Sequence, residues 1–234
     1  MTEMGFGSNV REIETQATYD KSTQEFIIHT PSTSATKFWI GNMAGIFSSF
    51  FPPISSVYGT LAVVFAQLEI EGVQRGVHAF VVPIRDPITK QLFPNIEIGD
   101  CGLKVGWNGI DNAWIRFTQV RIPRCHLLNR FSDVLPNGTF ITSASSPDKL
   151  FQKTLSQLMV GRLLYITGPV HALNLGLRIS IRYAFARRQF GSQQVINYSS
   201  HKYALMPMLA FTLGLEFTRN QLMQMLGGKN RYKN

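Results

Sequence analysis

Cysteine is scarce in this sequence, with two residues in a chain of 234. Cys101 and Cys125 form no C-x-x-C pair, and no histidine cluster lies near either of them. A disulfide framework needs several spaced cysteines, and a zinc site needs closely spaced cysteine or histidine ligands. The sequence therefore predicts no disulfide framework, no metal site and a reducing compartment.

Targeting and membrane features are scarce as well. Residues 1–5 lack the basic and apolar regions of a secretory signal, and residues 231–234 differ from the peroxisomal address Ser-Lys-Leu. Residues 38–68 carry no charge, but Pro52 and Pro53 interrupt them. A membrane-spanning helix needs about 20 consecutive apolar residues, and paired prolines break a helix. We therefore expect no membrane span and no targeting signal in these residues.

Acidic residues are few in the second part of the chain. Residues 1–130 hold 11 lysines and arginines against 11 aspartates and glutamates, whereas residues 131–234 hold 12 against 3. The net charge of +9 thus lies in the second part, which predicts two domains, 1–130 and 131–234. Such a charge permits nucleic-acid binding. No DNA- or RNA-binding motif accompanies it, so we expect no nucleic-acid partner; steeply salt-dependent DNA binding would reverse this view.

The hydrophobic pattern changes its period between these parts. The first part has short β-type runs bounded by turn residues, the clearest being 25–29, 61–66, 78–83 and 114–117. From about Pro147 the spacing is helical, with long segments at 162–190 and 201–226. Pro169 and Pro207 fall within these segments, which predicts kinks or first-turn placements. The predicted class is α+β: a β-barrel or sandwich followed by an antiparallel helical-bundle segment.

Four segments in a fixed order carry the functional signal. They are Thr-Glu-Met-Gly-Phe-Gly-Ser-Asn at 2–9, Lys-Phe-Trp-Ile-Gly-Asn at 37–42, Val-Arg-Ile-Pro-Arg at 120–124 and Phe-Ala-Arg-Arg-Gln-Phe-Gly at 185–191. The glycines of the first segment let the backbone approach a ligand closely, although Gly-x-Gly alone also fits an ordinary turn. Together the segments resemble the acyl-CoA dehydrogenase and oxidase superfamily. The first looks specifically like the acyl-CoA oxidase branch, and the likeness extends to about residue 215.

The resemblance implies FAD as the cofactor. Thr2 matches the threonine that hydrogen-bonds the flavin ring, and Trp39 matches the tryptophan packed against the flavin. Gly41 matches the position whose backbone lies along the isoalloxazine. Ser8 matches a serine near both the flavin phosphates and the acyl-CoA. A core tryptophan in a strand remains compatible with the role of Trp39, because one residue can pack and bind at once.

The arginines of the second part match further ligand positions. Arg187 and Gln189 match the helix end that reaches the FAD of a partner subunit, which implies a homodimer. Arginine suits forked recognition of a pyrophosphate, while a solvated basic helix end is the alternative, above all for Arg188. Arg162 matches the arginine that passes the CoA moiety. Because an arginine in an apolar helix must find an anion or reach solvent, we favour the CoA interpretation over a structural ion pair.

The implied reaction converts an acyl-CoA and molecular oxygen into a 2-enoyl-CoA and hydrogen peroxide, with a glutamate as the general base. This sequence ends before the usual position of that glutamate, and the N-terminal helical domain of the family is also not within it. Some relatives place the base directly before the CoA arginine, where this chain has Gly161. Glu216 reads as a helix surface residue. We therefore assign no catalytic residue and expect the isolated chain to be inert.

Two alternatives stay open at this point. The chain could be a non-catalytic remnant that binds FAD or acyl-CoA, or part of a dehydrogenase that passes electrons to a carrier flavoprotein. The resemblance implies a peroxisomal location. Residues 45–58 are additional relative to the family pattern and could be a true insertion or the trace of an imperfect gene model.

Overall fold

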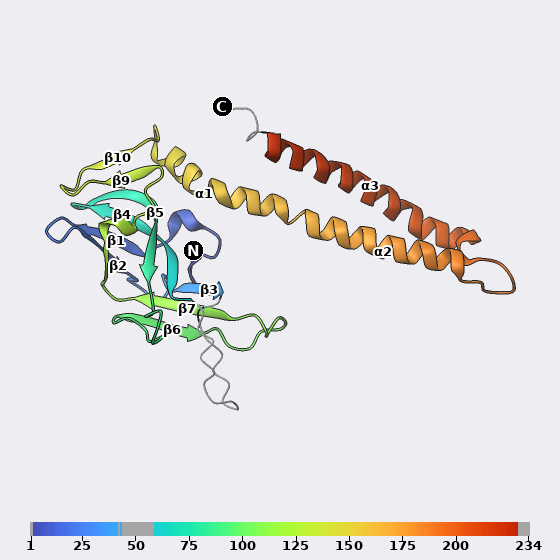
Figure 1. The fold of residues 1–234 in the computed structure, drawn as a ribbon, viewed down its shortest axis with the longest axis horizontal. Coiled ribbons are helices and arrows are strands. Elements are labelled where there is room, and N and C mark those ends of the chain that lie inside the picture. The colour runs from blue at the N-terminus through green and yellow to red at the C-terminus, as the bar shows by residue number, and fades with distance from the viewer. Residues whose placement is uncertain (1, 42, 44–58, 229–234) are drawn as a thin grey trace. The chain divides into compact units, whose positions relative to one another are not determined.

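The computed structural model describes residues 2–41, 43 and 59–228 (Figure 1). The additional residues 45–58 and the C-terminal residues 231–234 lie outside the described residues. The chain divides into two compact units, residues 1–154 and 155–234, and each is described by itself. The domain limits expected from charge and pattern, 1–130 and 131–234, stay a prediction.

The first unit is built mainly from strands. Its elements are η1 (Val10–Glu12), β1 (Gln16–Asp20), β2 (Glu25–His29), β3 (Lys37–Gly41), β4 (Leu61–Ile70), β5 (Val73–Pro83), β6 (Ile96–Asp100), β7 (Asn112–Phe117), β8 (Val120–Pro123), η2 (Arg124–His126), β9 (Ser132–Val134) and β10 (Phe140–Thr142). The four runs expected to be strands all lie within β2, β4, β5 and β7. Their alternation places every second side chain of β4 in the interior.

The described strands form three sheets. A five-stranded sheet has the order β5-β4-β1-β2-β8, a three-stranded sheet the order β3-β7-β6, and β9 pairs with β10. In the largest sheet β1 and β4 run parallel, while the other neighbours are antiparallel. These sheets do not close into a barrel within the described part of the chain. The predicted α+β class is confirmed, with the β part as separate sheets.

One hydrophobic core joins the two larger sheets. Phe26 lies between Tyr19 and Phe80, with ring centroids 5.2 and 5.0 Å away, and the three-stranded sheet contributes Ile115 and Phe117 to the same core. Each such side chain stabilises the fold by about 1.5–3 kcal/mol when fully buried. This core supports the edge of the three-stranded sheet, where several candidate site residues lie.

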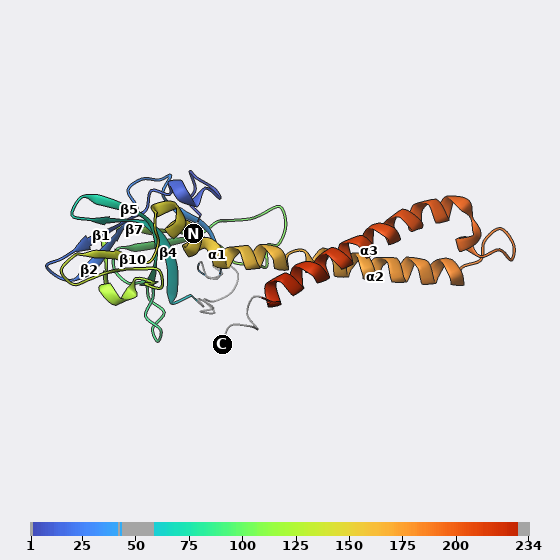
Figure 2. The ribbon, with the colours of Figure 1, turned by 90° about the horizontal axis from the view of Figure 1, so that it is seen from above.

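The helices are α1 (Pro147–Leu164), α2 (Thr167–Ala186) and α3 (Ser199–Gly228), with the short η3 (Val195–Asn197) before α3. In the second unit α3 runs back along α2 as an antiparallel hairpin (Figures 1 and 2). Leu177 and Ala184 of α2 pack with Leu205 of α3. Among the described residues, none of the helices is both long and apolar enough to cross a membrane.

The prolines explain how the helical segments are divided. The long segment expected at 162–190 is broken at Tyr165 and Ile166, and α2 begins at Thr167. Pro169 has no N–H to donate to the carbonyl of Tyr165, so it is accommodated in the first turn of a new helix. Pro207 lies inside α3. Pro169 thus has the predicted first-turn placement, whereas a kink at Pro207 stays a prediction.

Candidate functional site

The N-terminal segment 2–5 lies along the edge of β3. Its backbone hydrogen bonds run from Phe38 N to Thr2 O at 3.2 Å, from Met4 N to Thr36 O at 2.9 Å and from Gly5 N to Ser34 O at 2.9 Å. Glu3 and Lys37 face each other as an antiparallel bridge. The hydroxyl of Thr2 also donates to the carbonyl of Phe38 at 3.0 Å. The segment therefore extends the three-stranded sheet by a short strand-like edge.

A buried ion pair joins this segment to β3. Lys37 Nζ lies 2.8 Å from Glu3 Oε1, and both residues are 1% exposed. Lys37 also donates to the carbonyl of Phe65 at 2.6 Å. Glu3 in turn accepts hydrogen bonds from the backbone and hydroxyl of Thr15 and from the backbone of Glu14. Every polar group of the pair thus has a partner, as a buried charge requires.

Burial and attraction act in opposite directions on the carboxyl of this pair. Burial alone would raise the pKa of Glu3, but the Lys37 ammonium and the hydrogen bonds from Thr15 and Glu14 outweigh it and hold that pKa below its usual value. Burial lowers the pKa of Lys37, and Glu3 partly opposes this change. The pair is linked along the chain to Thr2, which precedes Glu3, and to Trp39, which follows Lys37 by two positions.

Trp39 stands at an irregularity in β3. The register of β3 against β7 shifts between Phe38 and Ile40, and Trp39 has a φ of 68°. A left-handed backbone is uncommon for a bulky residue, and an irregularity of this kind re-aims a side chain. The indole is 56% exposed as a result, and Lys104 Nζ lies 5.7 Å from its ring centroid. A partly exposed indole therefore follows Phe38, the residue that pairs with Thr2.

Gly41 ends the same strand, opposite Asn112 of β7. A Cβ placed on Gly41 would meet the carbonyl oxygen of Asp111 at 3.9 Å, an ordinary contact. Packing among the described residues therefore does not require a glycine here. Gly41 shares its strand with Trp39, and no other atom of the described residues comes within 4 Å of that Cβ.

Lys104 is a neighbour of Trp39 that the sequence patterns did not reveal. Its loop is closed by Asn108, which accepts from Lys104 N at 2.7 Å and donates to Lys104 O at 2.9 Å. The ammonium of Lys104 then reaches the side chain of Asn112 at 2.6 Å and the carbonyl of Ile110. Lys104 lies far from Trp39 in sequence, so no local spacing could have connected them.

Ser8 lies on the turn that follows the N-terminal segment. Gly7 N and Phe6 N both donate to the carbonyl of Glu3, at 3.0 and 3.3 Å, and Gly7 has a φ of 52°. The side chain of Ser8 is exposed. Gly5 is the glycine of this segment that approaches another group closely: a Cβ there would lie 2.7 Å from Ser34 Cβ.

The remaining candidates lie in the second unit. Arg187 ends α2, where its N–H donates to Tyr183 O at 2.8 Å and its carbonyl accepts from Val195 N at 2.9 Å. In the following loop the hydroxyl of Tyr198 donates to Gln189 O at 2.9 Å. The side chains of Arg187 and Gln189 are exposed. The structure thus presents these two side chains from one loop held by its own backbone.

Arg188 differs from its neighbours, because its guanidinium donates to the carbonyl of Ser192. Arg162 is an exposed residue of α1. No described atom outside the helix's own turns lies within 4 Å of a Cβ placed on Gly161. Glu216 forms an ion pair with Arg219 at 3.4 Å on α3.

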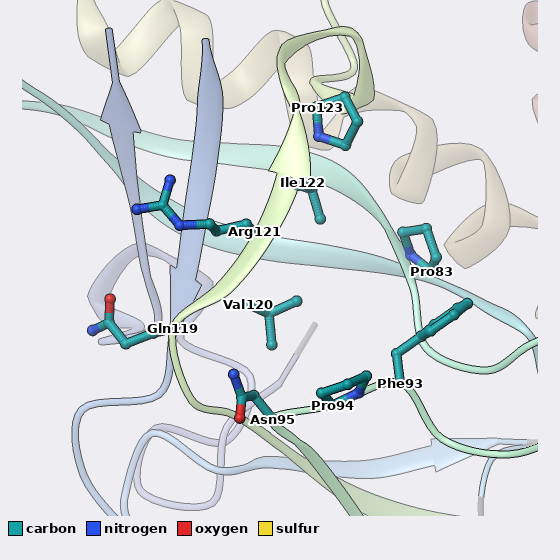
Figure 3. Close-up of a pocket in the computed structure, with 9 residues that line it drawn as sticks. All are labelled: Pro83, Phe93, Pro94, Asn95, Gln119, Val120, Arg121, Ile122 and Pro123. Carbon is teal, nitrogen blue, oxygen red and sulfur yellow. The ribbon is translucent and has the colours of Figure 1, made fainter. Parts of the chain in front are cut away.

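A pocket of about 420 Å³ in the first unit has a lining of its own (Figure 3). Its lining is mainly apolar and comes from the end of β5, the segment before β6 and the strand β8. Arg121 of β8 is held by Asp20 at 3.0 Å and Glu25 at 3.1 Å. The pocket contains none of the candidate site residues. Within the described residues there is also no group of three or more histidines, cysteines or carboxylates that could hold a metal ion.

Comparisons with known proteins agree in pointing to one family. Residues 155–233 match the family model "Acyl-CoA oxidase, C-alpha1 domain". Acyl-coenzyme A oxidase 3, peroxisomal, from Arabidopsis thaliana is 42% identical over 228 residues, which cover 95% of this chain and 32% of that protein. This name supports the expected peroxisomal location at the level of the family.

Solved structures give the same result. Acyl-CoA oxidase 1 from Yarrowia lipolytica matches 99% of this chain and 32% of its own with a TM-score of 0.81 and 36% identity. Acyl-CoA oxidase-1 from Caenorhabditis elegans, solved with FAD and ATP, matches 97% of this chain and 32% of its own with a TM-score of 0.75 and 33% identity. The chain spans about a third of the length of these relatives. Residues 155–233 match the C-alpha1 domain of acyl-CoA oxidases, and the chain is similar to these enzymes along nearly its whole length. The chain therefore belongs to the acyl-CoA oxidase family.

Proposed function

We propose that this chain forms the flavin-holding part of an FAD-dependent acyl-CoA oxidase of fatty-acid β-oxidation. The proposed reaction takes an acyl-CoA and O2 to a trans-2-enoyl-CoA and H2O2. The observation that carries the proposal is the exposed indole of Trp39, turned outward from β3 beside the Thr2 segment. A large aromatic side chain in a strained, exposed position is costly for the chain alone. It is useful where a flat ligand covers it.

The residues of the first unit fit an isoalloxazine. Trp39 would pack against the ring, Gly41 would let the ring lie along the backbone, and Thr2 would hydrogen-bond its polar edge. The Thr2 hydroxyl donates to Phe38 O and keeps lone pairs with which to accept a hydrogen bond. When bound, FAD would take up the hydride from the β-carbon of the acyl group. The chain's own residues would bind the isoalloxazine ring and orient it.

Two arginines and two uncharged polar residues are assigned to the phosphate-bearing parts of both ligands. We assign Arg162 and Ser8 to the acyl-CoA, and Ser8 also to the flavin phosphates. We assign Arg187 and Gln189 to the FAD of a partner subunit in a homodimer. Their exposed side chains stand on a loop held by its own backbone, which suits recognition of a pyrophosphate by a forked guanidinium.

The 234-residue chain by itself is proposed to bind without turnover. Position 161 is glycine and offers no carboxylate, while Glu216 is committed to Arg219. No carboxylate of the second unit therefore takes the role of general base in this proposal. This observation favours a second candidate, a non-catalytic module that binds FAD or acyl-CoA. A dehydrogenase that passes electrons to a carrier flavoprotein is the third candidate function. The oxidase-like sequence segments favour the oxidase over it.

Flavin binding tests the first part of the proposal. The purified chain is titrated against FAD, and the quenching of flavin fluorescence gives the dissociation constant. Trp39→Ala is expected to weaken binding at least tenfold, because the stacking face is lost. Trp107→Ala is the matched control, since Trp107 is also exposed and also has a positive φ, 61°. Equal effects of the two substitutions, or no FAD binding by the wild-type chain, would refute the assigned site.

Turnover tests the second part. The FAD-loaded chain is mixed with an acyl-CoA in air, and peroxide is measured with a peroxidase-coupled dye. We expect none, and measurable peroxide would refute the proposed inertness and reject the non-catalytic role. Reduction of a carrier flavoprotein without peroxide would instead favour the dehydrogenase. Sedimentation of the FAD-loaded chain tests the homodimer, which a purely monomeric flavin complex would contradict.

A further inference from the structure

The buried pair Glu3–Lys37 stands between two residues that the proposed function assigns to the flavin. Thr2 directly precedes Glu3, and Trp39 follows Lys37 by two positions. We propose that this ion pair is a positioning device that holds Thr2 and Trp39 in the geometry that receives the ring. The inference rests on the proposed FAD site, and it adds Glu3 and Lys37 as residues that act through their neighbours.

The direction of the side chains supports this role. In a regular strand, positions 37 and 39 point to the same face. Lys37 points inward, to Glu3 and to Phe65 O, so a regular β3 would bury the indole as well. The register shift at Trp39 turns the indole outward and brings Ile40 to the core. Lys37 on one side and Ile40 on the other thus fix the two residues between them, Phe38 and Trp39.

The strain at Trp39 also requires a firm support. A bulky residue stays in the left-handed region only when its surroundings hold it there. The support on the N-terminal side is Lys37, because its ammonium is tied to Glu3 at 2.8 Å and to Phe65 O at 2.6 Å. Glu3 is tied in turn to Thr15 and Glu14. The position of the indole is therefore coupled to that of the Thr2 segment.

A role in positioning can be separated from a role in stability. Replacing both members of a buried ion pair by uncharged residues is often neutral or stabilising, whereas removing one member leaves an unpaired buried charge. A double substitution can therefore retain the fold while it loses the electrostatic tie between segment 2–5 and β3. If the pair only stabilised the fold, such a variant would bind FAD normally.

The test compares Glu3→Gln, Lys37→Met and the double variant with the wild-type chain. Ile28→Val is the control, since Ile28 is fully buried in β2 and its shortening weakens the core without touching segment 2–5. FAD dissociation constants are measured by flavin fluorescence. Each chain is also labelled with 5-fluorotryptophan, and the ¹⁹F resonance of Trp39 is identified as the one absent from Trp39→Phe.

We expect the variants of the pair, including the double variant, to shift the Trp39 resonance and to weaken FAD binding at least tenfold. Ile28→Val should leave the resonance in place and the dissociation constant within twofold. An unshifted Trp39 resonance with near-normal affinity in a folded variant of the pair would overturn the proposal. If the wild-type chain does not bind FAD, the proposed function fails. The Trp39 resonance still shows whether the ion pair positions the indole. If Lys37→Met does not fold, the double variant carries the test.

Discussion

Gly5→Ala should destabilise the first unit through one identifiable contact. The new Cβ would lie 2.7 Å from Ser34 Cβ and 3.3 Å from Ser34 Cα and O. Real Cβ atoms essentially never approach another heavy atom as closely as the first of these distances. Segment 2–5 would have to move away from residues 34–38, and this would strain the hydrogen bond from Gly5 N to Ser34 O.

The magnitude follows from two opposing effects. The φ of Gly5 is not in the left-handed region, so alanine at this position would by itself stabilise the fold by about 0.4–1 kcal/mol through the unfolded chain. Overpacking costs about 1–3 kcal/mol. We therefore expect a net loss of about 1–2 kcal/mol in the free energy of unfolding.

A double-mutant cycle isolates the contact. Ser34→Gly removes the atom that the new Cβ would meet, so Gly5→Ala should be nearly neutral in that background, a coupling of about 1–2 kcal/mol. Urea unfolding followed by tryptophan fluorescence is a suitable assay, because all three tryptophans, at positions 39, 107 and 114, lie in the first unit. Additive effects of the two substitutions, within about 0.5 kcal/mol, would refute the steric account.

Gly7→Ala is the control for this cycle. No atom of the described residues lies within 4 Å of a Cβ placed there, but the φ of 52° is unfavourable for alanine. Its cost, about 1 kcal/mol of backbone strain, should not change when Ser34 is replaced. A coupling between Gly7→Ala and Ser34→Gly would show that the cycle reports a general loosening of the segment.

Three further predictions concern other parts of the fold. Burial lowers the pKa of His78 below its ordinary 6.5, and a hydrogen bond to Gly76 O partly opposes this change. As the pH falls below 6.5 the unfolded chain binds the proton first, so the free energy of unfolding decreases by up to about 1.4 kcal/mol for each unit that the pH falls. His78→Gln should flatten this slope in urea unfolding at pH 5–7. Phe26→Ala should cost about 3–5 kcal/mol, because Phe26 is fully buried in the core, and a loss below 1 kcal/mol would contradict that placement. Pro207→Ala should raise the helix content and the melting temperature of the second unit, measured by circular dichroism, because it restores an N–H that can donate to the carbonyl of Tyr203.

The sequence predicts the fold class better than the sheet topology. Alternating apolar runs such as 61–66 and 78–83 become the central hairpin of β4 and β5, and helical spacing locates α2 and α3. β1 and β6 were not recognised because polar residues interrupt them, and they become strands by pairing with β2, β4 and β7. Pairing of this kind is a tertiary effect that local propensity does not report.

Some residues of the candidate site were predictable from the sequence and others were not. The resemblance assigned Thr2, Trp39 and Gly41, and the structure brings all three to β3 and the segment beside it. Lys104 was missed because its contact with Trp39 depends on the register of β7 against β3, which no motif encodes. The buried charges were missed for another reason. Lysine and glutamate are almost always exposed, so Lys37 in particular reads as a solvated residue until its partner is known.

Trp39 shows why the site required the structure. From the sequence, an aromatic residue two positions after Lys37 is equally compatible with a core tryptophan and with a ligand face, because alternation fixes only that the two side chains share a side. Lys37 is buried by its pairing with Glu3, which would place the tryptophan in the core. One residue in a left-handed conformation reverses this result. The cost of that conformation is borne by a support whose members are 34 positions apart. The proposed binding face and the buried ion pair are therefore two consequences of the same local geometry, and a substitution that relaxes one should be visible in the other.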